Sequence, residues 1–367
     1  MNMKLSEITS FLESFAPLEW QEDYDNSGLI VGKTDQEINQ ALISLDCTEA
    51  VIDEAIRSHC NLIISHHPIV FKGMKRFNDA SYIERVISKA IKHNIALYAI
   101  HTNLDNILLG VNKQIMSCLG IQKPVILSPK EGILKKLSVF VPVGHVEQVR
   151  NALFTAGAGN IGNYSECSFN IDGMGTFFPK GNANPTLGEI GVREETKETS
   201  IEVIYPKHLE RNILIAMFES HPYEEVAYNI YSLSNAYQEV GSGMVGNLPE
   251  ALPPDAFLTY LKEKMQLSVI RHTQKPEKDI QRIAVCGGAG SFLLKQAIRA
   301  GADAFISADF KYHEFFDAEN KIMIADIGHF ESEQFTQHLL LEEIQNKFPN
   351  FAIRITIENT NPIKYFF

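Results

Sequence analysis

Two adjacent histidines end an apolar run in the sequence Ser65-His66-His67-Pro68. The run predicts a buried strand, and Pro68 stops it because proline lacks the amide hydrogen that strand pairing uses. Neighbouring side chains on a strand point to opposite faces. We therefore expect the imidazoles of His66 and His67 to diverge, and to hold two different metal ions rather than share one.

Two later segments add residues that bind metals, each after a predicted strand. His101 and Asp105 form one pair, and His329 and Glu333 form the other. Carboxylates and imidazoles both bind divalent ions. If a helix begins near His329, Glu333 lies one turn further on the same side, whereas Glu331 points elsewhere. Each pair alone also fits a surface ion pair, but the three signals together predict a dinuclear metal site.

Ligand counting separates a catalytic site from a structural one. The predicted metal ligands are His66, His67, Asp105, His329 and Glu333. They make about six bonds if one carboxylate bridges, whereas two four-coordinate ions need about eight, so water fills the open positions that mark catalytic sites. Water held between two cations has a pKa of about 7 and is a ready nucleophile. His101 could be a further ligand, a base or a hydrogen-bond donor. These ligands suit zinc first, with iron or manganese as alternatives.

Strands and helices alternate in the first and last thirds of the chain. The patterns predict strands at 41–45, 62–65, 96–101, 282–286, 304–307, 321–326 and 351–357, and helices at 48–58, 81–93, 111–119, 292–300 and 331–348. Such alternation predicts an α/β core domain with a mostly parallel sheet. Functional side chains gather at the carboxyl ends of parallel strands, and the predicted metal ligands fall there.

A weak internal repeat distinguishes the middle of the chain. The segments 139–154 and 203–218 align, and each reads as a strand ending in proline followed by a helix. The pattern predicts an inserted ferredoxin-like α+β domain over residues 128–244. The core domain is then discontinuous, with residues 1–127 and 245–367, and glycine- and proline-rich stretches form the linkers.

Two weaker features lie in the last third. The segment Gly287–Ser291, between a strand and a helix, could hold an anion at the helix N-terminus or form a tight structural turn. Asp309 and His313 follow the strand predicted at 304–307 and could serve as acid/base groups or substrate contacts, or form a surface pair.

Composition narrows the class of protein. The 33 Lys and Arg residues against 45 Asp and Glu residues give a net charge of −12, which disfavours nucleic acid as a partner. The five cysteines form no C-x-x-C pair, so we expect a reducing compartment and no disulfide framework. Because the start is polar and no apolar run reaches about 20 residues, we expect no signal peptide and no membrane span, and a cytoplasmic location.

The three histidine-containing segments, 65–68, 101–105 and 328–333, resemble the signature motifs of the NIF-three-like family, whose members also carry the name GTP cyclohydrolase I type 2 homolog. Residues 24–28, 286–288 and 308–318 are similar to further family segments. The insert, including residues 220–225, is similar to the PII-like module of the longer members. The resemblance therefore spans both ends of the chain and the insert.

The resemblance implies two divalent metal ions per subunit and a homohexamer in which the inserts cap the openings. It implies that His67 and Asp105 bind one ion, that His66 and His329 bind the other, and that Glu333 touches both. Two functions stay open. One is a two-metal hydrolase for a nucleotide or phosphate-containing small molecule, in which His101 or His313 shuttles protons. The other is a non-catalytic metal-binding protein that senses a small ligand through the insert.

Overall fold

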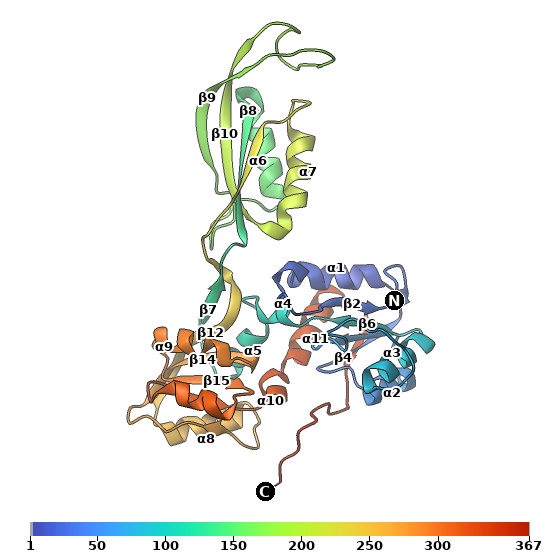
Figure 1. Cartoon of the computed structure of the whole chain (residues 1–367), viewed down its shortest axis with the longest axis vertical. Helices are drawn as coiled ribbons and strands as arrows, with labels where there is room; N and C mark the ends of the chain where they lie inside the picture. Colours follow the sequence, from blue (N-terminus) through green and yellow to red (C-terminus); the bar gives the residue numbers. More distant parts are fainter. Residues whose placement is uncertain (1–2, 367) are drawn as a thin grey trace. The chain divides into compact units, whose positions relative to one another are not determined.

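The chain folds into two compact units, which the computed structural model describes over residues 3–366 (Figure 1). The core unit is Met1–Ser128 with Val240–Phe367, and the inserted unit is Pro129–Glu239. Residues 240–244, expected in the insert, therefore belong to the core unit. Each unit is described by itself.

The core unit contains a five-stranded sheet in the order β17-β4-β5-β6-β2. Its strands are β2 (Gly28–Val31), β4 (Gln40–Ser44), β5 (Leu62–Ser65), β6 (Ala96–Ala99) and β17 (Ala352–Ile355). Neighbours from β17 to β6 run parallel, and β2 runs antiparallel to β6. The C-terminal strand thus completes the N-terminal sheet. β1 (Met3–Lys4) and β3 (Glu37–Ile38) form a separate two-stranded sheet, and Ile38 packs into the same hydrophobic cluster as β4 and β5.

Both faces of this sheet are covered, which explains its continuous apolar strands. In β5, Leu62 and Ile64 pack into one hydrophobic cluster with helices α1 (Leu5–Phe15) and α11 (Thr336–Lys347). Ile63 packs into another cluster with α2 (Glu49–Arg57) and α3 (Tyr82–Lys92). Alternation thus divides each buried strand between two cores. The first-third helices are α1 (Leu5–Phe15), α2 (Glu49–Arg57), α3 (Tyr82–Lys92), α4 (Thr102–Asp105) and α5 (Val111–Cys118).

A second, six-stranded sheet in the core unit has the order β13-β16-β15-β14-β12-β7. Its strands are β7 (Val125–Lys130), β12 (Tyr237–Leu252), β13 (Arg271–His272), β14 (Ile280–Ala289), β15 (Ala304–Ala308) and β16 (Met323–Asp326). The neighbours β14, β15 and β16 run parallel. β12 pairs antiparallel with β14, and β13 pairs antiparallel with β16. The core is therefore a mixed α/β fold with two principal sheets rather than one largely parallel sheet.

The C-terminal helices differ from the prediction in one respect that matters for the site. The single helix expected over 331–348 is two helices, and the first ends at Glu333. The helices of this part are α8 (Pro254–Lys264), α9 (Leu294–Arg299), α10 (His329–Glu333) and α11 (Thr336–Lys347), and a 3-10 helix, η5, covers Tyr312–Ala318. No described helix is long and apolar enough to cross a membrane.

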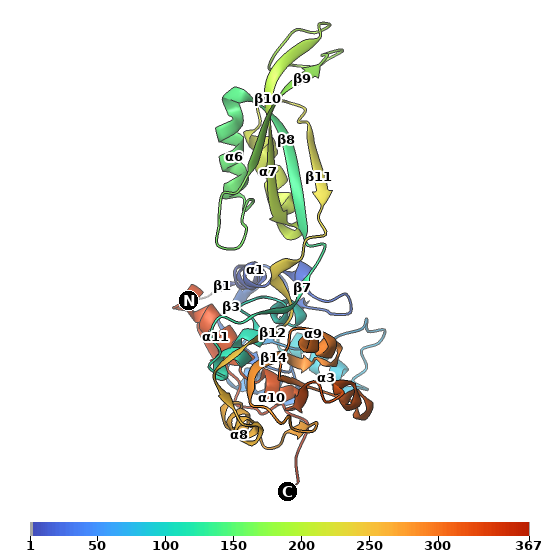
Figure 2. The ribbon, with the colours of Figure 1, turned by 90° about the vertical axis from the view of Figure 1, so that its left-hand side faces the viewer.

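The inserted unit has the β-α-β-β-α-β order that the internal repeat predicts (Figure 2). Its elements are β8 (Leu134–Pro142), α6 (Val146–Thr155), β9 (Phe169–Phe177), β10 (Glu194–Pro206), α7 (Glu210–Ser220) and β11 (Tyr228–Ser232). The antiparallel sheet has the order β11-β8-β10-β9, and α6 and α7 share a hydrophobic cluster with one of its faces. Pro142 and Pro206 each end a strand before a helix.

Candidate metal centre

Four histidines of the core unit gather where the carboxyl ends of strands from its two sheets meet. His66 and His67 follow β5 directly, and their ring centroids lie only 4.9 Å apart. The expectation that these imidazoles diverge was wrong. Because β5 ends at Ser65, the two histidines lie in a bend beyond it, where the alternation of strand side chains no longer applies.

An oxygen atom lies within hydrogen-bond distance of the Nδ1 atom of each histidine. The pairs are His66 with the Ile100 carbonyl at 2.8 Å, His67 with Asp46 at 2.8 Å, His101 with Asp25 at 2.7 Å and His329 with Asp309 at 2.6 Å. A neutral imidazole that donates from Nδ1 carries its lone pair on Nε2. Such contacts fix the orientation of metal-binding histidines in proteins.

The Nε2 atoms converge with two carboxylates. Glu333 Oε2 lies 3.0 Å from His67 Nε2 and 3.2 Å from His329 Nε2, and these two nitrogens are 3.2 Å apart. His66 Nε2 lies 3.6 Å from Asp105 Oδ1 and 3.9 Å from Glu333 Oε1. Three groups could each hold a metal ion: His67, His329 and Glu333; His66, Asp105 and Glu333; and His66, His67 and His101. We call these six residues the histidine–carboxylate cluster.

Unsatisfied atoms show what the cluster lacks. His66 is fully buried, and neither its Nε2 atom nor Asp105 Oδ1 has a hydrogen-bond partner among the described residues. A buried polar atom without a partner is costly, and acceptor lone pairs that face one another repel. A divalent cation among these atoms would give each of them a partner and would remove the repulsion between their lone pairs. The donor set therefore fits a metal ion.

The pKa values point the same way. Burial would lower the pKa of His67, but the carboxylates of Asp46 and Glu333 raise it to about 10. Burial would also lower the pKa of His329, but Glu333 and Asp309 raise it to about 11. Burial raises the pKa of Asp105 to about 7. The field at the centre of the cluster therefore attracts positive charge, whether protons or a metal ion.

Gly288 explains why the glycine-rich segment lies beside the cluster. Its φ of +62° suits glycine, and a Cβ there would collide with Glu333 Oε1. The backbone of β14 thus passes directly against the carboxylate that spans the cluster. The segment Gly287–Ser291, for which an anion-holding loop and a tight turn were both open, is mostly strand, since β14 continues to Ala289.

A cavity of about 640 Å³ opens over the cluster. Its lining includes exposed aromatic side chains, Tyr24, Phe71, Tyr82 and Phe292, together with Asn112 and Thr360. No lysine or arginine lines it among residues 3–366. Apart from its histidines, the described lining therefore offers no basic side chain to balance its carboxylates, which again favours bound cations.

The structure brings the five predicted ligands together, although it groups them differently from the resemblance. His66 groups with Asp105 and Glu333, and His67 groups with His329 and Glu333. His101 joins them as a possible ligand. Asp309 contacts His329 Nδ1 and so orients that ring.

His313 is not brought to the cavity. Asp309 has a φ of +58°, so the chain turns sharply after β15 and η5 carries His313 to the surface. Of the alternatives left open for Asp309 and His313, pocket contacts or a surface pair, the structure does not bring the two into the cavity lining, which includes neither of them among the described residues. His313 is exposed.

Two carboxylates that orient histidines were missed as functional residues. Asp46 follows β4, and Thr360 donates a hydrogen bond to it at 2.7 Å. Asp25, in the segment before β2, also accepts hydrogen bonds from Thr102. Asp46 could have been found from its position after a strand that neighbours β5. Asp25 lies in the segment 24–28 that resembles a family segment, but its contact with His101 joins residues 76 positions apart, which no local pattern predicts.

The fold and the cluster define an α/β protein with a buried site suited to divalent metal ions. The chain belongs to the Duf34/NIF3 (NGG1p interacting factor 3) family, whose model matches residues 3–362, and this confirms the resemblance seen in the sequence. A Bacillus subtilis (strain 168) protein named GTP cyclohydrolase 1 type 2 homolog is 36% identical over 369 residues, which cover 98% of both chains.

Two further comparisons agree. A protein of the same name from Halalkalibacterium halodurans is 39% identical over 324 residues, covering 88% of this chain and 87% of that one. The crystal structure of a Bacillus cereus protein related to NIF3 is 37% identical, with a TM-score of 0.86 over 99% of both chains. The mixed α/β fold is therefore that of solved NIF3-related structures.

Proposed function

We propose that this protein is a hydrolase that depends on two divalent metal ions and acts on a nucleotide or another phosphate-containing small molecule. The observation that carries the proposal is the convergence of imidazole Nε2 atoms and carboxylate oxygens at one end of an open cavity. One ion would be held by His67, His329 and Glu333, and the other by His66, Asp105 and Glu333. His101 could add a further ligand, since its ring groups with those of His66 and His67.

When bound, such ions make coordinated water acidic and stabilise negative charge on a substrate oxygen. The protein's own side chains do the positioning. Asp46, Asp25 and Asp309 keep Nδ1 of their histidines engaged, so that Nε2 faces the cavity. Even if Glu333 bridges, the six residues of the cluster provide about seven bonds of the roughly eight that two four-coordinate ions need, which leaves room for substrate or water.

The cavity wall suits a planar ring. Tyr24 and Phe292 are 69% and 62% exposed, so their faces are available for stacking near the cluster. The relatives' name, GTP cyclohydrolase 1 type 2 homolog, points to a purine nucleotide, and this supports GTP as the first substrate to test. Phosphate oxygens would be neutralised by the metal ions, since the described lining holds no lysine or arginine.

The test measures metal content by mass spectrometry and then hydrolysis of GTP, other nucleotides and phosphoesters by zinc-, manganese- or iron-loaded protein. We expect turnover only with metal. Glu333→Gln should lower the rate by more than the roughly 10- to 100-fold that losing a partner of a metal ligand costs.

Glu331→Gln is the matched control, because Glu331 lies on the same short helix but contacts Asn361. It should retain turnover. Metal-loaded protein that hydrolyses nothing in the panel would contradict the proposal and support a non-catalytic metal-binding protein. Activity that persists in Glu333→Gln would reveal a contaminating hydrolase.

A further inference from the structure

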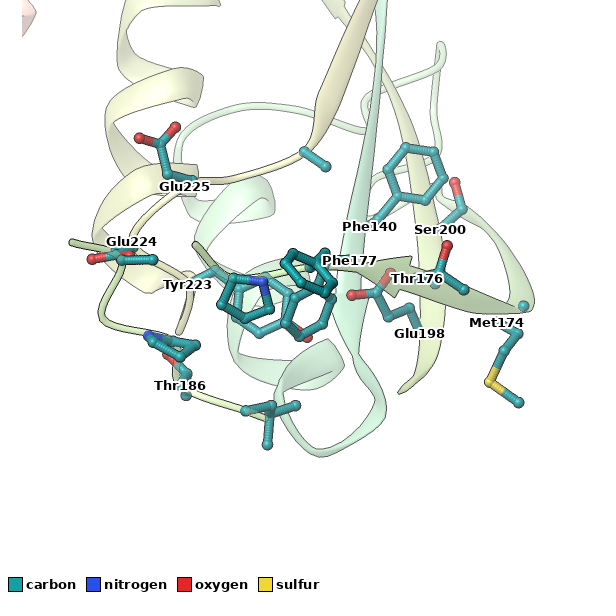
Figure 3. Close-up of a pocket in the computed structure, with 18 of the residues that line it drawn as sticks. Phe140, Met174, Thr176, Phe177, Thr186, Glu198, Ser200, Tyr223, Glu224 and Glu225 are labelled. Carbon is teal, nitrogen blue, oxygen red and sulfur yellow. The ribbon is translucent and has the colours of Figure 1, made fainter. Parts of the chain in front are cut away.

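The inserted unit contains a pocket of its own, of about 540 Å³, which neither the cluster nor the proposed reaction uses (Figure 3). That volume lies within the range of small-molecule sites. Its residues come from strands β8, β9 and β10, from the loop after β9 and from the turn after α7. The pocket therefore exists only in the folded unit.

The floor of the pocket is the sheet face that α6 and α7 leave uncovered. Ile201 and Val203 of β10 pack against the helices, so Glu198 and Ser200 point the other way. Ser200 pairs with Phe140 and with Ile171 on the neighbouring strands, and directly paired residues share a face. All four residues line the pocket.

Two glycines keep this floor open. Gly173 of β9 pairs with Glu198, and Gly175 lies one pair further along the same face. A Cβ on Gly175 would collide with the Glu198 carboxylate, whereas a Cβ on Gly173 would meet nothing within 4 Å. Glycine weakens a strand and often marks a close approach of another group. Here the glycines leave space beside a carboxylate.

Aromatic rings stand next to that carboxylate. The rings of Phe177 and Tyr223 lie 6.1 Å apart, and Figure 3 shows Glu198 beside them. Two hydrogen bonds join the loop after β9 to the turn after α7. Asn184 donates its backbone N–H to Glu224 at 2.7 Å, and Thr186 donates to the Pro222 carbonyl at 2.7 Å. The pocket is thus held by specific contacts rather than by chance packing.

The charge of the lining selects the ligand. Three carboxylates belong to the pocket lining, those of Glu198, Glu224 and Glu225, and no lysine, arginine or histidine lines the pocket among the described residues. Asp172 contributes only backbone, because its carboxylate accepts a hydrogen bond from Thr199 on the opposite face of the sheet. An anion would be repelled, and a neutral ligand would bury Glu198 without compensation. Aromatic faces beside a carboxylate favour an ammonium group.

We propose that the inserted unit binds a small organic cation in this pocket, namely a protonated or quaternary amine carried on an apolar body. The ammonium group lies between Glu198 and the rings of Phe177 and Tyr223. The apolar body covers the glycine floor toward Ile171 and Phe140. The proposal is independent of the hydrolase, because every residue that carries it belongs to the inserted unit.

The test is isothermal titration calorimetry of the full chain with 2-phenylethylammonium, with 2-phenylethanol as the neutral analogue and 3-phenylpropanoate as the anionic one. We expect only the ammonium compound to bind with a Kd below about 1 mM. Glu198→Gln should weaken binding about tenfold or more. Gly173→Val should abolish it, because valine suits a strand and fills the open floor.

Glu195→Gln is the matched control, because Glu195 lies on β10 but does not line the pocket. It should bind like the wild type. Circular dichroism and metal content verify that each variant is folded. Equal binding of the alcohol or the carboxylate, undiminished binding by Glu198→Gln, displacement by millimolar Mg²⁺, or no binding at all would each overturn the proposal.

Discussion

The core cavity and the pocket of the inserted unit are both acidic, yet they surround their carboxylates differently. In the core, Glu333 lies 3.0 Å from His67 Nε2 and 3.2 Å from His329 Nε2. In the insert, Glu198 has aromatic rings and glycines around it. Nitrogen lone pairs at such distances favour a compact metal ion, whereas aromatic faces favour an organic ammonium group. Negative charge alone therefore does not identify a ligand; its neighbours do.

The two regions also use glycine in opposite ways. At Gly288 the backbone is pressed against Glu333, with no room for a side chain. At Gly173 the space beyond the backbone is open. One glycine allows a tight contact within the protein, and the other leaves room for a molecule from outside.

The largest expected effect tests whether each unit binds its own class of ligand. Each ligand is added separately, and hydrogen exchange is followed in both units. Metal at about 1,000 times its Kd should stabilise the core unit by about 4 kcal/mol, because it binds only the folded cluster. Protection should rise in peptides that cover residues 62–67 and 323–333. The ammonium compound should instead protect residues 169–177 and 194–200.

Chelator treatment of the metal-loaded protein provides the control, since it should reverse protection in the core unit only. Protection of both units by either ligand would contradict the assignment of separate ligand chemistries.

A smaller effect is expected from Gly288→Ala. The added methyl group would displace Glu333 and would strain a left-handed backbone, so metal affinity should fall at least about tenfold, or about 1.4 kcal/mol. Competition with a metal-binding dye measures it. Gly173→Ala is the control in the other unit and should leave metal affinity unchanged. Equal affinities for both variants would show that Glu333 does not need its present position.

The smallest expected effect is a loss of stability of the inserted unit at acidic pH. Burial lowers the pKa of His221, whose Nε2 lies 3.0 Å from the Phe140 carbonyl. The unfolded chain then binds this proton more readily than the folded one, so stability should fall as the pH drops below about 6.5. Thermal unfolding at pH 7 and pH 5 measures the loss. His221→Gln should show a smaller loss than the wild type, and an equal loss would assign the acid sensitivity to other groups.

Much of the secondary structure followed from the sequence because its signals are local. The apolar run before His66 forms β5 over the predicted residues, and Thr48 and Ser81 cap the helices that they precede. The break between Glu333 and Thr336 and the separation of the core into two sheets were not predictable in this way. Both depend on which strands pair, and parallel pairing joins residues far apart in the chain.

The amino-acid sequence alone identifies the side chains that can act as metal ligands, because imidazoles and carboxylates that follow buried strands gather at one edge of a sheet. It also determined the family, since three separated motifs occur in order. Only the tertiary structure decided that His66 and His67 converge, that Asp25 and Asp46 orient histidines and that His313 lies apart. It alone assembled the pocket around Glu198. The physical reason is that side-chain direction beyond a strand end, and contact between distant segments, depend on tertiary packing rather than on local pattern.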